Sequence, residues 1–167
     1  TSARVLLVRY VKNGYVIRLK RNVFILKEKW ENLSLEQKFY IANILQVPSY
    51  ISCTTALSYY GYTTQVQQNF IESVGIYRTK QINVENSVFK YIKLNKKYYF
   101  DFIKKDNFFI ATPEKAFIDS LYLMIKGRYS IDLSAVDQRK FDKNKIAKIL
   151  KKYPQKISKA ILNLCKI

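Results

Sequence analysis

Six basic side chains near the start of this sequence are well suited to one kind of chemistry, the binding of phosphates. They fall within residues 1–22, where no acidic residue is present: Arg4, Arg9, Lys12, Arg18, Lys20 and Arg21. Four of the seven arginines in the chain lie in this stretch. The planar guanidinium group matches phosphate oxygens and guanine edges. A cationic stretch without acids therefore predicts contact with a polyanion such as DNA.

A second basic stretch lies in the last 30 residues of the sequence. Residues 138–167 hold ten basic residues and a single acid, Asp142, whereas residues 23–137 are nearly balanced, and the net charge is +18. Lys145, Lys148 and Lys152 recur at helical spacing, which places them on one face of a helix. Two interpretations stay open for this face: a solvated surface, or a second surface that binds a polyanion.

The sequence offers little for catalysis or for metal binding. It has no histidine, and its two cysteines have no further cysteine or histidine at the spacing of metal ligands. The only carboxylate-x-lysine pattern, Glu36-Gln37-Lys38, lies at a predicted helix start without a partner acid. None of the four glycines belongs to a phosphate-binding loop. We therefore expect no enzyme activity, no catalytic or metal-binding residues and no cofactor.

The first basic stretch is predicted to fold as a helix followed by a hairpin. Ser2 can cap a helix that runs to about Lys12, and Asn13-Gly14 ends it. Residues 15–19 and 23–26 are expected to be strands, joined by a turn at residues 20–22. A helix followed by a cationic hairpin is typical of the second half of a winged helix. We therefore expect residues 1–30 to be the C-terminal part of a truncated winged helix-turn-helix domain, the alternative being an edge hairpin whose charges are only solvated.

Residues 31–167 are predicted to form an α+β domain, a mixed sheet with packed helices. Ser34 and Gln37 form a capping box for a helix to about residue 45. Thr112-Pro113-Glu114 begins another helix, which runs to about residue 126. Asp142 is predicted to cap a lysine-rich helix. Segments 70–77 and 87–94 alternate as strands, and we expect them to be antiparallel neighbours joined by a polar connection.

Two segments of this domain combine start and stop signals with an apolar face. Pro48–Gly61 is predicted to be a short strand followed by a helix that Ser52 caps, and Ala111–Leu123 contains the Thr112 helix start, with Asp119 on a flank of that helix. Together they resemble the AbiEi family of bacterial abortive-infection antitoxins, which are also described as transcriptional regulators of viral defence systems. The resemblance extends over about residues 6–133.

The resemblance implies a winged helix placed before an antitoxin domain, here residues 31–167. It implies a type IV toxin-antitoxin function, in which the protein represses its own operon by binding double-stranded operator DNA. The same protein would counter a nucleotidyltransferase-like toxin, or protect the nucleic-acid target of that toxin. The motif residues to which the resemblance draws attention are Tyr50, Ser52, Tyr60, Thr112, Glu114 and Asp119.

An antitoxin and autorepressor of an abortive-infection operon is therefore the expected function. The alternative is a stand-alone, basic nucleic-acid-binding regulator without a toxin partner, for which the charge and the abundant aromatic residues would suffice. The sequence has no apolar run of about 18 residues and no leader segment, so we expect a cytoplasmic protein without a membrane partner. A monomer is favoured.

Overall fold

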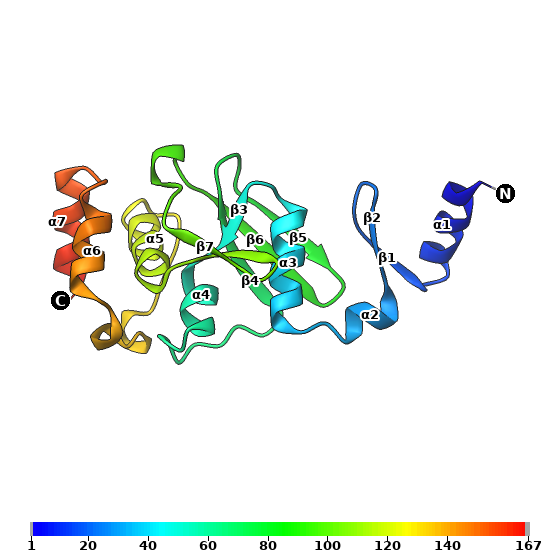
Figure 1. Cartoon of the computed structure of the whole chain (residues 1–167), viewed down its shortest axis with the longest axis horizontal. Coiled ribbons are helices and arrows are strands. Elements are labelled where there is room, and N and C mark those ends of the chain that lie inside the picture. Colours follow the sequence, from blue (N-terminus) through cyan, green and yellow to red (C-terminus); the bar gives the residue numbers. More distant parts are fainter. Residues whose placement is uncertain (1, 166–167) are drawn as a thin grey trace.

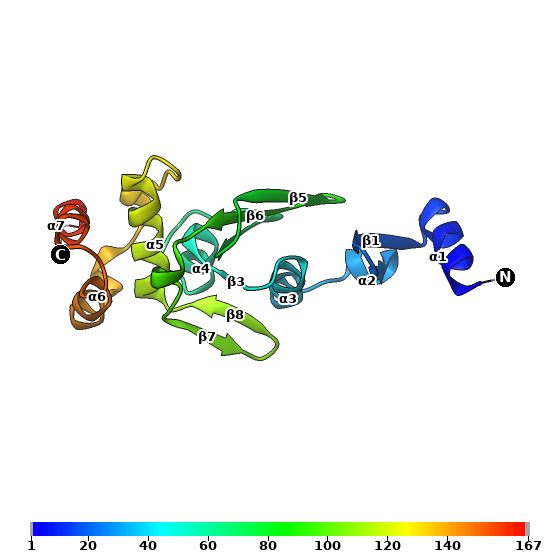
Figure 2. The same cartoon turned by 90° about the horizontal axis from the view of Figure 1, so that it is seen from above.

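Two β-sheets of unequal size organise the chain in the computed structural model, which describes residues 2–165. The smaller sheet is a two-stranded hairpin, and the larger sheet has six strands in the order β5-β6-β4-β3-β8-β7. The molecule is elongated, with α1 at one end, α6 and α7 at the other, and the larger sheet between them (Figures 1 and 2). The chain thus has an α+β fold, as the sequence predicts.

The hairpin pairs β1 and β2 in antiparallel fashion. In the larger sheet β3 runs antiparallel to β4 and parallel to β8, while β4 runs parallel to β6. The edge strands β5 and β7 are antiparallel to β6 and β8, respectively. The bounds of the strands are β1 Val16–Lys20, β2 Val23–Leu26, β3 Ser49–Ile51, β4 Phe70–Gly75, β5 Lys80–Val84, β6 Ser87–Lys93, β7 Phe102–Lys105 and β8 Phe108–Ala111.

The helices cover the larger sheet and extend beyond it. Helix α3 packs against β3, β4 and β8, whereas α4 packs against β4 and α5, and α6 and α7 cover α5. The bounds of the α-helices are α1 Ala3–Lys12, α2 Lys27–Glu31, α3 Leu35–Leu45, α4 Cys53–Tyr59, α5 Pro113–Ile125, α6 Lys143–Leu150 and α7 Gln155–Leu164. Three short 3-10 helices lie at Lys96–Tyr98, Leu133–Ala135 and Gln138–Lys140.

The predicted helix starts at Ser34, Thr112 and Asp142 are confirmed. Ser34 Oγ accepts a hydrogen bond from the amide of Gln37, and the Gln37 side chain accepts one from the amide of Ser34, which completes the capping box. Thr112 caps α5 with Pro113 at its first position, and Asp142 caps α6. Each cap satisfies amides that have no partner within the helix, so these starts can be predicted from local sequence.

The prediction that segments 70–77 and 87–94 are antiparallel is wrong, because β4 and β6 pair in parallel register from Phe70↔Val88 to Gly75↔Lys93. The polar connection between them contains an additional strand, β5, which pairs with β6 across a turn at Glu85 and Asn86. This strand adds a second reversal of the chain. The two longer strands therefore point in the same direction.

The prediction that the Ser52 side chain caps α4 is also wrong. Ser52 occupies the N-cap position, but its side chain makes no capping hydrogen bond there. Its hydroxyl group donates instead to Asp119, a residue of α5. The motif serine therefore joins two elements that lie far apart in the sequence.

The hairpin and the larger sheet share a continuous apolar core. Ile17 and Leu19 of β1 and Trp30 of α2 are buried in the same cluster as the sheet residues. The ring of Trp30 lies edge-on to that of Phe89 in β6, with 6.3 Å between the ring centroids. Among residues 2–165, no helix combines the length and the apolar character that crossing a membrane requires. The core cluster and the Trp30 contact thus join the hairpin and α2 to the body of the protein.

Candidate functional site

Helix α1 presents three of the predicted DNA-binding cations to solvent. Arg4, Arg9 and Lys12 are all exposed, and no residue of the helix is buried. Ser2 Oγ accepts a hydrogen bond from the amide of Val5 and so caps the helix as predicted. The helix therefore offers a cationic surface that the rest of the described chain does not cover.

The other three predicted cations lie in the β1–β2 hairpin, Lys20 and Arg21 at its turn and Arg18 two residues before it, and all are exposed. Arg18 and Arg21 form no ion pair with any residue in the range 2–165, whereas Lys20 Nζ donates a hydrogen bond to the carbonyl oxygen of Ile44. That carbonyl lies in the last turn of α3, where the negative end of the helix dipole favours a cation. Lys20 thus joins the hairpin to α3, and the two arginines remain available.

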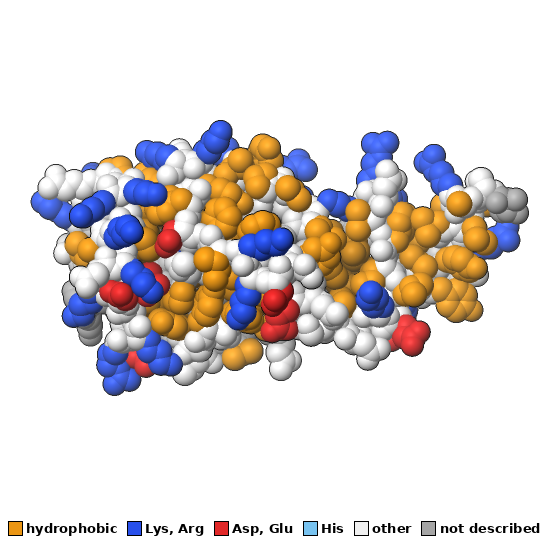
Figure 3. Space-filling view, viewed as in Figure 1, with side chains coloured by type: hydrophobic (Ala, Val, Ile, Leu, Met, Phe, Trp, Pro, Cys, Tyr) orange, Lys and Arg blue, Asp and Glu red, His pale blue; other side chains and the backbone are white. Residues whose placement is uncertain are grey.

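Basic side chains of α1 and of the hairpin gather at one end of the molecule. In Figure 3 basic side chains project from the hairpin and from α1 at that end. Within residues 2–165 the only two ion pairs are Lys115–Asp119 and Arg139–Asp137, so none of the six N-terminal cations is paired with an acid. Their positive field is therefore not neutralised locally.

The second predicted basic surface lies at the opposite end of the molecule (Figure 1). Lys145 and Lys148 of α6, with Lys152 just after it, are exposed. Lys152 Nζ lies 3.9 Å from the ring centroid of Phe100. This cation–π contact attracts the ammonium group to the ring. Because the two basic surfaces lie at opposite ends, a single small ligand cannot contact both.

Three of the predicted antitoxin-motif residues meet inside the protein. Tyr50 Oη and Ser52 Oγ donate hydrogen bonds to Asp119 Oδ2, at 2.8 Å and 2.9 Å. All three residues are fully buried. Asp119 therefore lies in the interior and not on a solvent-exposed flank of α5. The motif brings β3, the start of α4 and α5 to one carboxylate.

Lys115, a residue that the sequence analysis missed, completes this buried network. Its Nζ donates to Asp119 Oδ1, and Tyr153 Oη lies 3.5 Å from the same nitrogen. Burial raises the pKa of the Asp119 carboxyl group, while Lys115 and the two hydroxyl donors act in the opposite direction. Burial also raises the pKa of Tyr50 well above its ordinary value. A network without access to solvent can hold elements together but cannot reach a substrate.

The remaining motif residues support the start of α5 and its neighbours. Thr112 Oγ1 accepts from the amide of Lys115 and donates to Asp101 Oδ2 at 2.7 Å. Glu114 is buried, and its Oε1 accepts a hydrogen bond from the amide of Asp142. Burial raises the pKa of Tyr60 to about 12, with smaller contributions from Tyr59 and Glu114. The two side-chain hydrogen bonds link the start of α5 to Asp101, just before β7, and to Asp142, which caps α6.

A second buried carboxylate, Glu72 of β4, was also missed. Glu72 Oε2 accepts a hydrogen bond from Tyr129 Oη at 2.8 Å, and the amide of Glu72 donates to Thr55 Oγ1. Tyr129 Oη also lies 2.7 Å from Thr54 Oγ1. Burial raises the pKa of Glu72, and the Tyr129 hydrogen bond acts against this shift. The residues form a structural link between β4 and α4.

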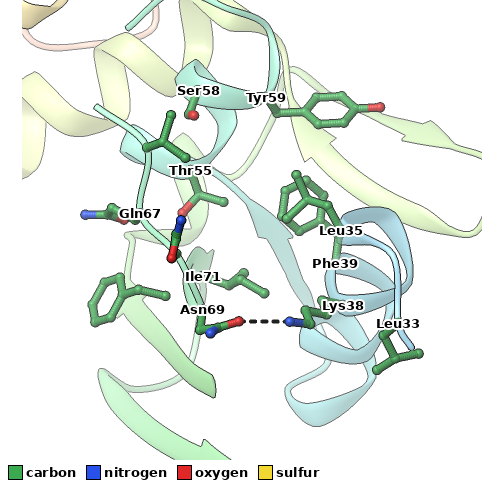
Figure 4. A pocket seen from close by; sticks show the side chains of 13 residues that line it. Leu33, Leu35, Lys38, Phe39, Thr55, Ser58, Tyr59, Gln67, Asn69 and Ile71 are labelled. Carbon is green, nitrogen blue, oxygen red and sulfur yellow. Dashed lines mark hydrogen bonds between the residues drawn. The ribbon is translucent and has the colours of Figure 1, made fainter. Parts of the chain in front are cut away.

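A surface pocket of about 300 Å³ opens beside α4 (Figure 4). Phe39 and Ile71 contribute apolar surface, and Gln67 and Asn69 contribute amide groups. Lys38 lines the pocket, but its Nζ already donates to Asn69 Oδ1 at 2.9 Å. The lining has no carboxylate, thiol or imidazole group, so it lacks the groups that commonly activate a nucleophile.

In comparisons with known proteins, the chain matches no family model and no curated protein. Function must therefore be inferred from the residues themselves, from their positions, and from the motif resemblance. The described residues divide into two groups. The cations of α1 and the hairpin are exposed and can meet a partner, whereas the motif residues lie mainly in the interior.

Proposed function

We propose that this chain is a DNA-binding regulator and that α1 and the β1–β2 hairpin form its DNA-binding surface. The observation that carries the proposal is the group of six exposed, unpaired cations on two adjacent elements at one end of the molecule. Phosphate contacts supply most of the affinity of such surfaces for DNA. Arginine adds the ability to read guanine edges. We propose no catalytic role and no cofactor.

In this proposal α1 and the hairpin act as the recognition helix and the wing of a winged helix. An α-helix fits the major groove of B-form DNA, where the edges of all four base pairs differ. Arg4 and Arg9 of α1 would face the major groove, while Arg18 and Arg21 would contact phosphates or the minor groove beside it. Lys20 contributes less, because Ile44 already holds its ammonium group.

Salt dependence tests the role of the hairpin. Alanine at both Arg18 and Arg21 is expected to reduce the slope of log affinity against log salt concentration by about 1.8, because each lost phosphate contact is worth about 0.9. Titrations of duplex DNA at several salt concentrations measure this slope. Alanine at Arg78 and Arg128, two exposed arginines of the main body, removes the same charge and is expected to leave the slope unchanged. Equal slopes for wild type and the hairpin variant would show that the tip does not touch DNA.

We further propose that residues 31–167 serve as the antitoxin part of a toxin-antitoxin pair. This part of the proposal rests on the resemblance of Pro48–Gly61 and Ala111–Leu123 to the AbiEi family. It is supported by the hydrogen bonds that Tyr50 and Ser52, from the first segment, donate to Asp119, from the second. The two segments of the resemblance therefore meet in one buried network. Contact with the toxin or its nucleic-acid target would use the surface that this network shapes.

Co-expression separates the antitoxin role from DNA binding. The whole chain with alanine at Arg4, Arg9, Arg18 and Arg21 is expected to bind DNA poorly but still to relieve growth arrest by the cognate toxin. Expressing the toxin from an unrelated promoter removes any effect of operon repression, and growth rate is the measurement. Continued arrest in cells that hold soluble, folded wild-type chain would refute the antitoxin role and favour a stand-alone DNA-binding regulator.

The lysine face of α6 supports a second, separate contact with nucleic acid. Lys145, Lys148 and Lys152 are exposed and lack acidic partners among residues 2–165, and they lie at the far end from α1. Alanine at all three is expected to reduce the salt slope by up to about 2.7. The same titrations measure it. If the slope stays at the wild-type value while the hairpin variant lowers it, the lysines form only a solvated surface.

A further inference from the structure

Helix α1 exposes two valines on the same arc as its three cations. At 100° per residue, Arg4, Val5, Val8, Arg9 and Lys12 all fall within an arc of about 140°. Val5 and Val8 are 49% and 64% exposed. Leu7 and Val11, next to the Arg4 edge of this arc, are only partly exposed, and Leu6 and Tyr10 on the far side are less exposed than the two valines, at 41% and 43%. The helix thus turns branched apolar side chains outward, between cations.

A single exposed valine needs no explanation, but this arrangement fits one feature of duplex DNA. The major groove is polar except for the C5-methyl groups of thymine, which apolar side chains contact in direct readout. Phosphates and guanine edges, which arginine and lysine contact, lie beside those methyl groups. An arc that mixes three cations with two apolar side chains therefore matches a thymine-containing stretch of the groove.

We propose that Val5 and Val8 read thymine methyl groups in the DNA that this chain prefers. The inference rests on the proposed DNA-binding function and adds to it the residues that select the sequence. Arg4, Arg9 and Lys12 hold the helix in the groove through phosphates and guanine edges, and the valines pack on methyl groups between those contacts. Sites that lack thymine at the matching positions leave the valines against polar base edges.

Replacing thymine by deoxyuridine tests this directly, because it removes only the methyl group and keeps pairing and charge. The whole 167-residue chain is first used to select preferred duplexes from a random pool, and each thymine of the selected site is then replaced in turn. We expect about four-fold weaker binding at one or two positions, which corresponds to about 0.8 kcal/mol for a buried methyl-sized group.

Val5→Ala and Val8→Ala extend the test to the protein. Alanine keeps the helix, because it is the best helix former, and shortens only the apolar side chain. Each variant is expected to bind thymine and deoxyuridine equally well at the position that its valine reads. Val66→Ala, which shortens a valine that is 74% exposed in the loop before β4, should retain the four-fold preference.

The possible failures can be told apart. Failure of the chain to bind any duplex at low salt would overturn the proposed DNA-binding function, and the inference with it. Binding to selected duplexes without any effect of deoxyuridine would overturn only the inference, and would leave the valines to contact a protein or the sugar-phosphate backbone. A thymine preference that both valine variants retain would also overturn it.

Discussion

Replacing Asp119 by alanine is expected to lower the free energy of unfolding by about 3 to 5 kcal/mol. The substitution removes the only acidic partner that Lys115 has among the described residues, and both side chains are fully buried. An unpaired charge in the interior has lost its hydration without gaining a partner, which is why breaking a buried pair is so costly. Tyr50 and Ser52 lose their hydrogen-bond acceptor in the same step. Urea denaturation of the two proteins measures the difference.

Two further variants show whether burial is the cause. Arg139→Ala breaks an exposed ion pair with Asp137, in which the arginine side chain is 91% exposed, and is expected to cost less than about 1 kcal/mol. Replacing Lys115 by methionine and Asp119 by leucine together removes both charges, and is expected to cost less than Asp119→Ala alone. Equal losses of unfolding free energy for Asp119→Ala and Arg139→Ala would mean that burial of the Lys115–Asp119 pair does not raise the cost of breaking it.

Leu57→Ala and Leu121→Ala are each expected to lower the free energy of unfolding by about 2 to 5 kcal/mol. Both side chains are completely buried, Leu57 in α4 and Leu121 in α5, where those two helices pack together. Truncation removes apolar contact and leaves a cavity that the surrounding structure fills only in part. Chemical denaturation measures both losses, with the same dependence of the free energy of unfolding on denaturant concentration used for wild type and variants.

Leu162→Ala is the matched control for these two substitutions. Leu162 lies in α7 and is 45% exposed, so the same change of side chain removes less buried surface there. We expect its cost to be well below that of either buried leucine. A loss below about 0.5 kcal/mol for both Leu57→Ala and Leu121→Ala would contradict the packing of α4 on α5.

Local signals in the sequence predicted the helix starts and the hairpin, because these depend on residues that are near neighbours along the chain. Ser34 and Gln37 cap each other over three residues, and Thr112 needs only the next three residues to cap α5. The hairpin follows from alternation and from a short turn, in which Asn22 has a positive φ.

Strand direction could not be predicted in the same way. Alternation along residues 70–75 and 87–93 marks strands, but it is identical for parallel and antiparallel pairing. The direction of β6 relative to β4 depends on β5, the strand between them. Lys80 and Gln81 give β5 the composition of a polar loop. Residues 80–84 form a strand because they pair with β6 in the sheet. Tertiary structure here overrides a weak local preference.

The candidate surfaces could be found from charge, whereas the buried network could not. Arg18, on the outward face of β1, and Arg21, in the turn, are exposed, as the alternation and the turn suggest. Lys20 looks the same in the sequence, but it contacts Ile44, 24 residues away. Lys115 and Asp119 do carry a signal, because they are four residues apart on one helix. Only the packing of β3, the start of α4 and Tyr153 around α5 shows that this pair is buried.

The shared core of the hairpin and the larger sheet has a mechanical consequence. Two contacts, Trp30 on Phe89 and Lys20 on Ile44, join α2 and the hairpin to the body. While these contacts hold, a chain seated on DNA places its far end, α6, in a direction that the groove sets. Two copies bound about 10 base pairs apart have their far ends on the same side of the duplex, and copies about 5 base pairs apart have them on opposite sides. The spacing of binding sites, and not the length of a tether, decides whether two such ends can meet.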